Sequence, residues 1–186
     1  MPGLILLCGV MLLIAFLPFI RFAFVRMAMT SRLRRVAKAR GMTVALRSPF
    51  SMLGGIGGAK NDLYIASGTR TYSVKLLGSP IKKTMLCFYD ATHYAVKEYR
   101  RATPLSEVFD GKERVKTKTA CDFTAFLPAG CERMRPVYLV YPTMLLIARK
   151  DGDTVTEVTD GGRLFDGRLY TLDRFLEKLE GDADAK

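Results

Sequence analysis

Asp62 and Lys75 are the residues whose types and spacing come closest to a chemical site. They lie on two short stretches, residues 62–66 and 71–77, whose apolar and polar side chains alternate as in half-buried strands. A turn at Gly68 would join these strands into an antiparallel hairpin. Asp62 then faces Lys75, and the carboxylate and the ammonium are expected to form an ion pair across the strands.

The pattern of the hairpin also predicts its register. A turn centred on Gly68 places Leu63 opposite Val74 and Ile65 opposite Tyr72, so that apolar side chains share one face. The opposite face carries the polar side chains of Asp62, Tyr64, Ser73 and Lys75.

This arrangement resembles nucleases of the restriction-endonuclease-like family, which place an Asp on one strand of a hairpin and Glu-x-Lys on the next. In this resemblance Asp62 matches the Asp, Lys75 matches the Lys, and Ser73 stands in place of the second acid. The resemblance implies carboxylates that hold Mg²⁺ and a lysine that assists the attacking water. A single carboxylate offers only half of the usual negative charge for this hard cation. The alternative interpretation is an ordinary cross-strand ion pair.

Other catalytic and metal-binding patterns do not occur in the sequence. It contains one histidine, His93, and none of the GxSxG, HExxH or DxDxDG motifs. The glycine-rich segment 54–60 leads into a strand and not into a helix, so it predicts a loop and not a phosphate-binding P-loop. The four cysteines are widely separated, without a CxxC pair. We therefore expect neither a metal ion nor a cofactor.

The N-terminal segment predicts a membrane anchor. Residues 4–20 are all apolar or small, and the seven charged residues up to position 41 are all basic. This pattern favours a transmembrane helix over residues 1–25, with the N-terminus outside and the rest of the chain in the cytoplasm. A cleaved signal peptide is the alternative. The residues expected to contact anionic headgroups are Arg21, Arg26, Arg32, Arg34, Arg35, Lys38 and Arg40.

The distribution of charge argues against a nucleic-acid-binding protein. The net charge is +11, but residues 42–186 account for only +4 of it. One set of basic residues on and beside the second predicted hairpin, residues 84–89 and 93–99, could contact a polyanion: Lys82, Lys83, Lys97, Arg100 and Arg101. Interleaved tyrosines such as Tyr94 could stack on bases, or they could simply pack in the core.

The remaining pattern predicts an α+β fold with a mostly antiparallel sheet and one or two helices. Residues 26–41 are expected to form a basic juxtamembrane helix, with Thr30 or Ser31 as the cap of a helical stretch that Gly41 ends. Residues 42–180 are expected to form one cytosolic α+β domain, and residues 181–186 an acidic tail. The last helix has Leu172, Phe175, Leu176 and Leu179 on one face, with Thr171 as its cap and Gly181 as its end.

These observations favour a membrane-tethered cytosolic domain that binds a partner without catalysing a reaction. Its expected partners are the lipid bilayer, anionic lipid headgroups and an unidentified protein. The alternative function is that of a degenerate or active restriction-endonuclease-like domain near the membrane, with Asp62 and Lys75 as the catalytic candidates.

Overall fold

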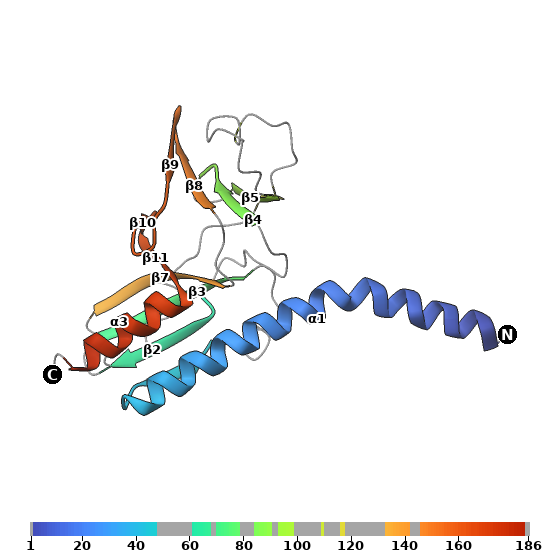
Figure 1. Ribbon diagram of the computed structural model, residues 1–186, viewed down its shortest axis with the longest axis horizontal. Coiled ribbons are helices and arrows are strands. Elements are labelled where there is room, and N and C mark those ends of the chain that lie inside the picture. Colours follow the sequence, from blue (N-terminus) through green and yellow to red (C-terminus); the bar gives the residue numbers. More distant parts are fainter. Residues whose placement is uncertain are drawn as a thin grey trace.

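The computed structural model describes residues 2–47, 61–67, 70–78, 84–90, 93–98, 109, 116–117, 133–141 and 146–184. Its helices and strands, in chain order, are α1 (Pro2–Ala39), β1 (Thr43–Leu46), β2 (Leu63–Ser67), β3 (Arg70–Gly78), β4 (Thr84–Phe88), β5 (His93–Glu98), β6 (Lys116–Thr117), β7 (Arg133–Tyr141), β8 (Leu146–Asp151), β9 (Thr154–Glu157), β10 (Arg163–Leu164), β11 (Gly167–Thr171) and α3 (Leu172–Asp184). The α+β content agrees with the sequence (Figure 1).

The strands form two mixed sheets. The six-stranded sheet has the order β1-β2-β3-β7-β11-β10, and the five-stranded sheet has the order β6-β5-β4-β8-β9. Six of the nine described strand pairs are antiparallel, as predicted, but the strands form two sheets, and the pairs at their centres are parallel: β7 with β3 and β11, and β8 with β4. Parallel partners need long connections, which local sequence patterns do not reveal.

Both predicted hairpins are confirmed. In the first, Leu63 pairs with Val74 and Ile65 with Tyr72, in the register expected from the alternation. In the second, β4 pairs with β5 in antiparallel orientation and lies between β5 and β8. Side chains of β4 are buried on both of its faces, with Leu86 and Phe88 in one cluster and Met85 and Cys87 in another.

α1 is one continuous helix, and its two halves have different surroundings (Figure 1). Its N-terminal part projects away from the sheets (Figure 1), and Val25 packs against the core; we call residues 2–24 the projecting half. The remaining part lies along the six-stranded sheet. The helix therefore does not begin at a Thr30 or Ser31 cap as predicted. It does end where expected, since Gly41 follows it with a φ of +68°, a conformation that glycine adopts without strain.

The predicted transmembrane helix is contradicted by the structure. Among the described residues, no helix combines the length and apolar character that crossing a membrane requires. The uninterrupted apolar run of 17 residues, 4–20, is shorter than the roughly 20 residues that span a bilayer. The remaining part of α1, residues 25–39, belongs to the folded domain.

The predicted juxtamembrane helix is part of the main hydrophobic core. Met29, Leu33 and Ala37 of α1 are fully buried, together with Phe175 and Leu179 of α3. They pack on one face of the six-stranded sheet against Leu63, Ile65, Val74, Leu76, Val137 and Leu139. The apolar stripe of α1 therefore faces a sheet and not a lipid surface, and the boundary expected at residue 42 cuts through the core.

The opposite face of the six-stranded sheet packs on the five-stranded sheet. Leu77, Tyr138, Val140 and Leu169 from the first sheet form one buried cluster with Leu86, Phe88, Tyr94 and Ile147 from the second. The described parts of the chain thus form successive layers of helices, sheet and sheet (Figure 1).

The last helix is confirmed in its position and its cap. The Arg174 backbone N–H donates to Thr171 Oγ1 over 3.4 Å, and Leu172, Phe175, Leu176 and Leu179 are buried. Its predicted end at Gly181 is wrong, because α3 continues to Asp184 through most of the expected acidic tail.

Candidate functional site

The structure brings Asp62 and Lys75 together, as the hairpin pattern predicts, and adds a third residue from α1. Lys75 Nζ lies 3.7 Å from Asp62 Oδ2, and Arg26 Nη2 lies 2.5 Å from Asp62 Oδ1. All three residues are buried, with exposed fractions of 1% for Arg26, 5% for Asp62 and 4% for Lys75. We call these three residues the Asp62 cluster.

Backbone contacts hold Asp62 in place within the sheet. Its Oδ2 accepts a hydrogen bond from the Leu76 N–H over 2.8 Å, and its own N–H donates to the Val74 carbonyl over 2.8 Å. Both carboxylate oxygens of Asp62 are therefore engaged by groups of this chain.

The structure corrects the prediction that Arg26 lies at the membrane surface. Arg26 was expected among the seven residues at the membrane surface, but it is buried and paired with Asp62. Arg26 lies one helical turn before Thr30, whose Oγ1 donates to the Arg26 carbonyl over 2.9 Å. The other described cations of this set, Arg21, Arg32, Arg34, Arg35, Lys38 and Arg40, are exposed.

The Asp62 cluster has the composition of a structural tie, that is, a set of ion pairs that holds elements of the fold together. Ser73, fully buried on the neighbouring strand, supplies a hydroxyl where the nuclease pattern has a second carboxylate. Within the described part of the chain, no group of three or more His, Cys, Asp or Glu side chains could hold a metal ion. A cation such as Mg²⁺ would have to compete with Arg26 and Lys75 for a single carboxylate. The arrangement links α1 to β2 and β3.

The predicted polyanion contacts are mostly outside the described residues. This applies to Lys82, Lys83, Arg100 and Arg101, and likewise to the glycine-rich segment 54–60. Lys97 is half-buried on β5. Tyr94 packs against Phe88 with ring centroids 5.5 Å apart, and its burial raises the pKa of its hydroxyl. Tyr94 is thus a core residue and not an exposed stacking platform.

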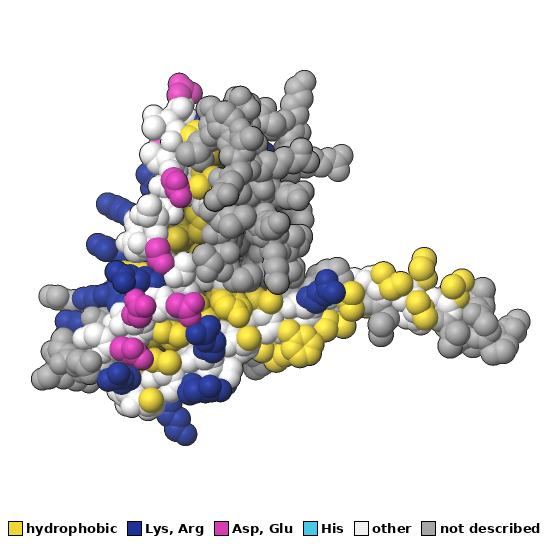
Figure 2. Space-filling view, viewed as in Figure 1, with side chains coloured by type: hydrophobic (Ala, Val, Ile, Leu, Met, Phe, Trp, Pro, Cys, Tyr) yellow, Lys and Arg dark blue, Asp and Glu magenta, His cyan; other side chains and the backbone are white. Residues whose placement is uncertain are grey.

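A second candidate site, which the sequence did not predict, is an open cavity of about 630 Å³. It lies where the start of β7, the turn between β10 and β11, and α3 meet. Four of its lining residues are cations, Arg135, Arg163, Arg168 and Lys178, and one is an acid, Asp166. We call it the basic cavity. Its wall also includes Tyr72, Met134, Pro136 and Tyr170. Figure 2 shows Lys and Arg side chains gathered at this end of the molecule.

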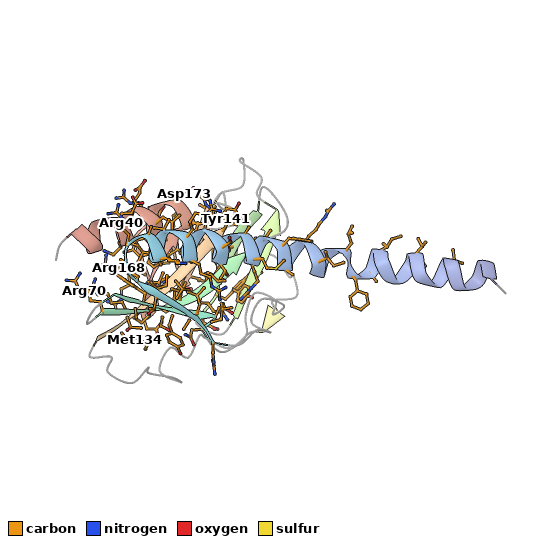
Figure 3. All side chains as sticks on the ribbon, turned by 90° about the horizontal axis from the view of Figure 1, so that it is seen from below. Arg40, Arg70, Met134, Tyr141, Arg168 and Asp173 are labelled. Atoms are coloured by element: carbon orange, nitrogen blue, oxygen red, sulfur yellow. The ribbon has the colours of Figure 1, made fainter. Side chains whose placement is uncertain are left out.

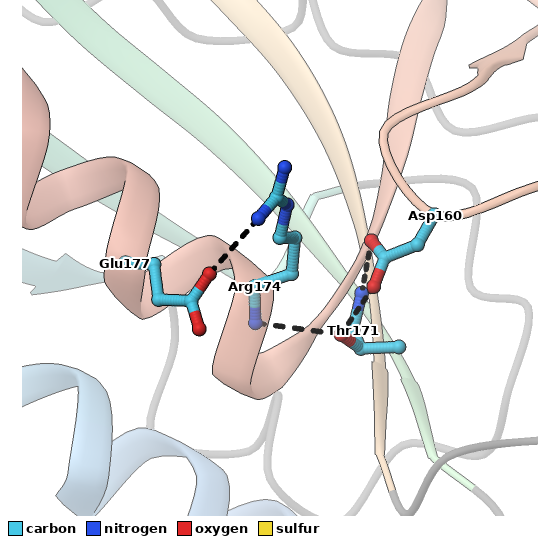
Figure 4. Close-up of polar contacts among 4 residues, drawn as sticks. All are labelled: Asp160, Thr171, Arg174 and Glu177. Atoms are coloured by element: carbon cyan, nitrogen blue, oxygen red, sulfur yellow. Dashed lines mark hydrogen bonds and ion pairs between the residues drawn. The ribbon is translucent and has the colours of Figure 1, made fainter.

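A smaller hollow of about 420 Å³ adjoins the basic cavity, because both are lined by Arg168, Tyr170 and Lys178. The carboxylates of this hollow, Asp160 and Glu177, form contacts with neighbouring side chains (Figure 4). Asp160 accepts hydrogen bonds from the Thr171 N–H and hydroxyl over 3.0 and 2.5 Å. Glu177 pairs with Arg174 over 3.1 Å. Arg174 therefore balances the charge of Glu177, whereas Asp160 keeps its negative charge in the hollow that Arg168 and Lys178 also line.

The sequence could not reveal the basic cavity, because its cations are far apart along the chain. Arg135 comes from β7, Arg163 and Arg168 flank the β10–β11 turn, and Lys178 comes from α3. Only the parallel pairing of β11 with β7 brings them to one place. A local signal exists only in the two arginines near Asp166-Gly167, which the sequence marks as a turn.

Gly167 lines the basic cavity and packs closely against β7, so its substitution is expected to destabilise the protein. A Cβ at this position would lie 3.0 Å from Tyr138 Cε2 and 3.1 Å from the Pro136 carbonyl oxygen. We expect Gly167→Ala to lower the free energy of unfolding by about 1–3 kcal/mol in urea titrations. The control is Gly181→Ala in α3, where a Cβ meets no atom within 4 Å. This variant should gain about 0.5–1 kcal/mol. Equal stability of the two variants would contradict the close packing at Gly167.

Comparisons with known proteins give no assignment for either site. No protein-family model matches the chain, and no curated protein or solved structure is significantly similar to it.

Proposed function

We propose that this protein is a non-catalytic binding domain that associates with the surface of a lipid bilayer through the projecting half of α1. The observation that carries the proposal is the exposure of large apolar side chains along this half. They are Leu7, Val10, Met11, Ile14, Phe16, Leu17, Ile20 and Phe24 (Figure 2). Exposed apolar surface of this extent on a projecting helix marks an interaction site.

The occupant that fits this surface is lipid, for two reasons. Leu7, Val10, Met11 and Ile14 recur at i, i+3, i+4 and i+7 and therefore share one side of the helix, as in a helix that lies at a bilayer surface with its apolar side toward the acyl chains. The following turns of α1 carry exposed Arg32, Arg34, Arg35, Lys38 and Arg40, which complement anionic headgroups.

Flotation with lipid vesicles tests this proposal. The full chain should float with phosphatidylcholine vesicles, and more strongly when phosphatidylserine is added. Leu7→Asp combined with Ile14→Asp should abolish flotation, because both side chains are exposed and would carry charge into lipid. Flotation that survives this double substitution would contradict the proposal.

A matched pair of variants separates the apolar from the electrostatic part of the interaction. Arg34→Glu combined with Arg35→Glu changes two exposed residues without touching the core. This variant should still bind phosphatidylcholine, but it should lose about 1 kcal/mol of binding free energy per residue on anionic vesicles.

A nuclease-related activity is the second candidate, and the observation that favours it is the 3.7 Å contact between Lys75 and Asp62 on neighbouring strands. We rank it lower because Arg26 and the Leu76 N–H already engage the only carboxylate of the cluster.

A further inference from the structure

The basic cavity has an excess of positive charge that calls for an anionic ligand. Its described lining residues comprise four cations and one carboxylate, a net charge of +3. The carboxylate, Asp166, also accepts a hydrogen bond from the Tyr138 hydroxyl over 3.4 Å. Arg163 and Arg168 are exposed to solvent, so a ligand can reach them. Positive side chains that converge on a concave surface strengthen the local field and attract anions.

The chemistry of these cations favours phosphate groups. Three of the four cations are arginines, and one planar guanidinium group can bind two phosphate oxygens at once. Two of them are partly positioned by contacts within the chain. Arg163 Nε donates to the Phe165 carbonyl over 3.2 Å, and the Arg135 guanidinium lies 6.0 Å from the ring centre of Tyr72. Such contacts reduce the conformational freedom that these side chains lose when a ligand binds.

The dimensions of the site exceed those of a single phosphate ion. A volume of about 630 Å³ falls in the range of pockets that hold small organic ligands. Tyr72, Met134, Pro136 and Tyr170 contribute apolar atoms to the wall, beside the arginines. The adjoining hollow extends the same surface past Arg168 and Lys178. The ligand therefore combines several anionic groups with an organic part.

The position of the cavity favours a soluble ligand over a lipid headgroup. Arg168 and Met134, which line it, lie at the end of the domain opposite to the projecting half of α1 (Figure 3). The helix between residues 21 and 39 alone extends over roughly 27 Å. A lipid headgroup in the cavity would therefore hold its acyl chains far from the apolar side chains of the projecting half.

We propose that the basic cavity binds a soluble, nucleotide-sized molecule that carries at least two phosphate groups. Arg163, Arg168, Arg135 and Lys178 contact the phosphates, and the organic part lies against Tyr170 and its apolar neighbours. This binding is independent of the association with lipid.

Isothermal titration calorimetry on the full chain in neutral detergent tests the proposal, with adenosine triphosphate and inorganic tripolyphosphate as probes. Both probes should bind, and the nucleotide more tightly. Arg163→Gln and Arg168→Gln should each weaken binding by about tenfold or more, which is the loss of one charge-assisted contact. Their melting temperatures should match that of the unchanged protein, because both side chains are exposed.

Matched controls make the result decisive. Arg34→Gln combined with Arg35→Gln removes two exposed cations that do not line the cavity, and it should leave nucleotide affinity within about twofold. Equal weakening by this control, or no binding of either probe, would overturn the proposal. Equal affinity for tripolyphosphate and nucleotide would overturn the assignment of an organic part.

Two further arms distinguish the source of the phosphates. In the Leu7→Asp, Ile14→Asp background, binding to vesicles that contain a bisphosphorylated phosphoinositide, without binding of either soluble probe, would show a lipid headgroup site instead. Binding of single-stranded RNA without binding of the soluble probes would likewise replace a small ligand with a nucleic acid.

Discussion

Deletion of residues 2–41 is expected to unfold the protein, whereas deletion of residues 2–20 should leave the domain folded. The longer deletion removes Met29, Leu33 and Ala37, which are fully buried between the sheet and α3. Truncating one large buried apolar side chain typically costs about 2–5 kcal/mol. Because small domains are stable by only about 5–15 kcal/mol, the loss of this entire layer exceeds the stability available.

The shorter deletion removes only residues from the projecting half. Circular dichroism and urea titration in neutral detergent measure the outcome for both truncated proteins, and the chain contains no tryptophan to serve as a fluorescent reporter. A point variant gives the same test without truncation. Leu33→Asp should unfold the protein, while Arg34→Asp at the adjacent exposed position should not. A cooperative unfolding transition for residues 42–186 alone would refute the assignment of α1 to the core.

Asp62→Ala is the second substitution with a large expected effect. It removes the carboxylate that Arg26 and Lys75 share and leaves both cations in the interior. Breaking a buried ion pair by removing one partner costs about 3–5 kcal/mol, because the remaining charge loses its compensation. Urea titration should show this loss in the free energy of unfolding. The exposed pair of Arg32 and Asp173, 2.7 Å apart, is the matched control. Asp173→Ala should cost about 1 kcal/mol or less.

Two further measurements distinguish a structural tie from a catalytic site. Replacing the whole cluster by apolar residues, with Arg26→Met, Asp62→Leu and Lys75→Met together, should restore much of the stability lost in Asp62→Ala. In parallel, the full chain is incubated with DNA and Mg²⁺, beside Lys75→Met. We expect no metal-dependent cleavage. Cleavage that disappears in Lys75→Met while stability is retained would establish the nuclease-related alternative and displace our interpretation.

The parts of the fold that could be predicted are those held by neighbours in sequence. The β2–β3 hairpin is an example, because alternating side chains and a short turn leave one register that buries Leu63 and Ile65 together. The C-terminal helix is another, since its cap at Thr171 and its apolar face lie within one segment. The contact between Asp62 and Lys75 follows from the same local register.

The parts that could not be predicted depend on partners far along the chain. The stripe of Leu33, Val36 and Ala37 is visible in the sequence, but an apolar stripe on a basic helix fits a lipid surface as well as a sheet. The apolar run at residues 4–20, which precedes this stripe, favours the lipid surface. Only the packed structure shows that Arg26 reaches Asp62, across 36 positions of sequence.

The sequence by itself thus determined the hairpins, the last helix, the facing of Asp62 and Lys75, and the apolar character of the N-terminal segment. These features depend on local periodicity, turns and caps, whose free energies are decided within a few residues. The tertiary structure alone decided that α1 completes the core, that β7 and β11 lie parallel beside β3, and that four distant cations line one cavity. Each of these arises from contacts between distant segments, which form only when burial of the shared core offsets the entropy of closing long loops.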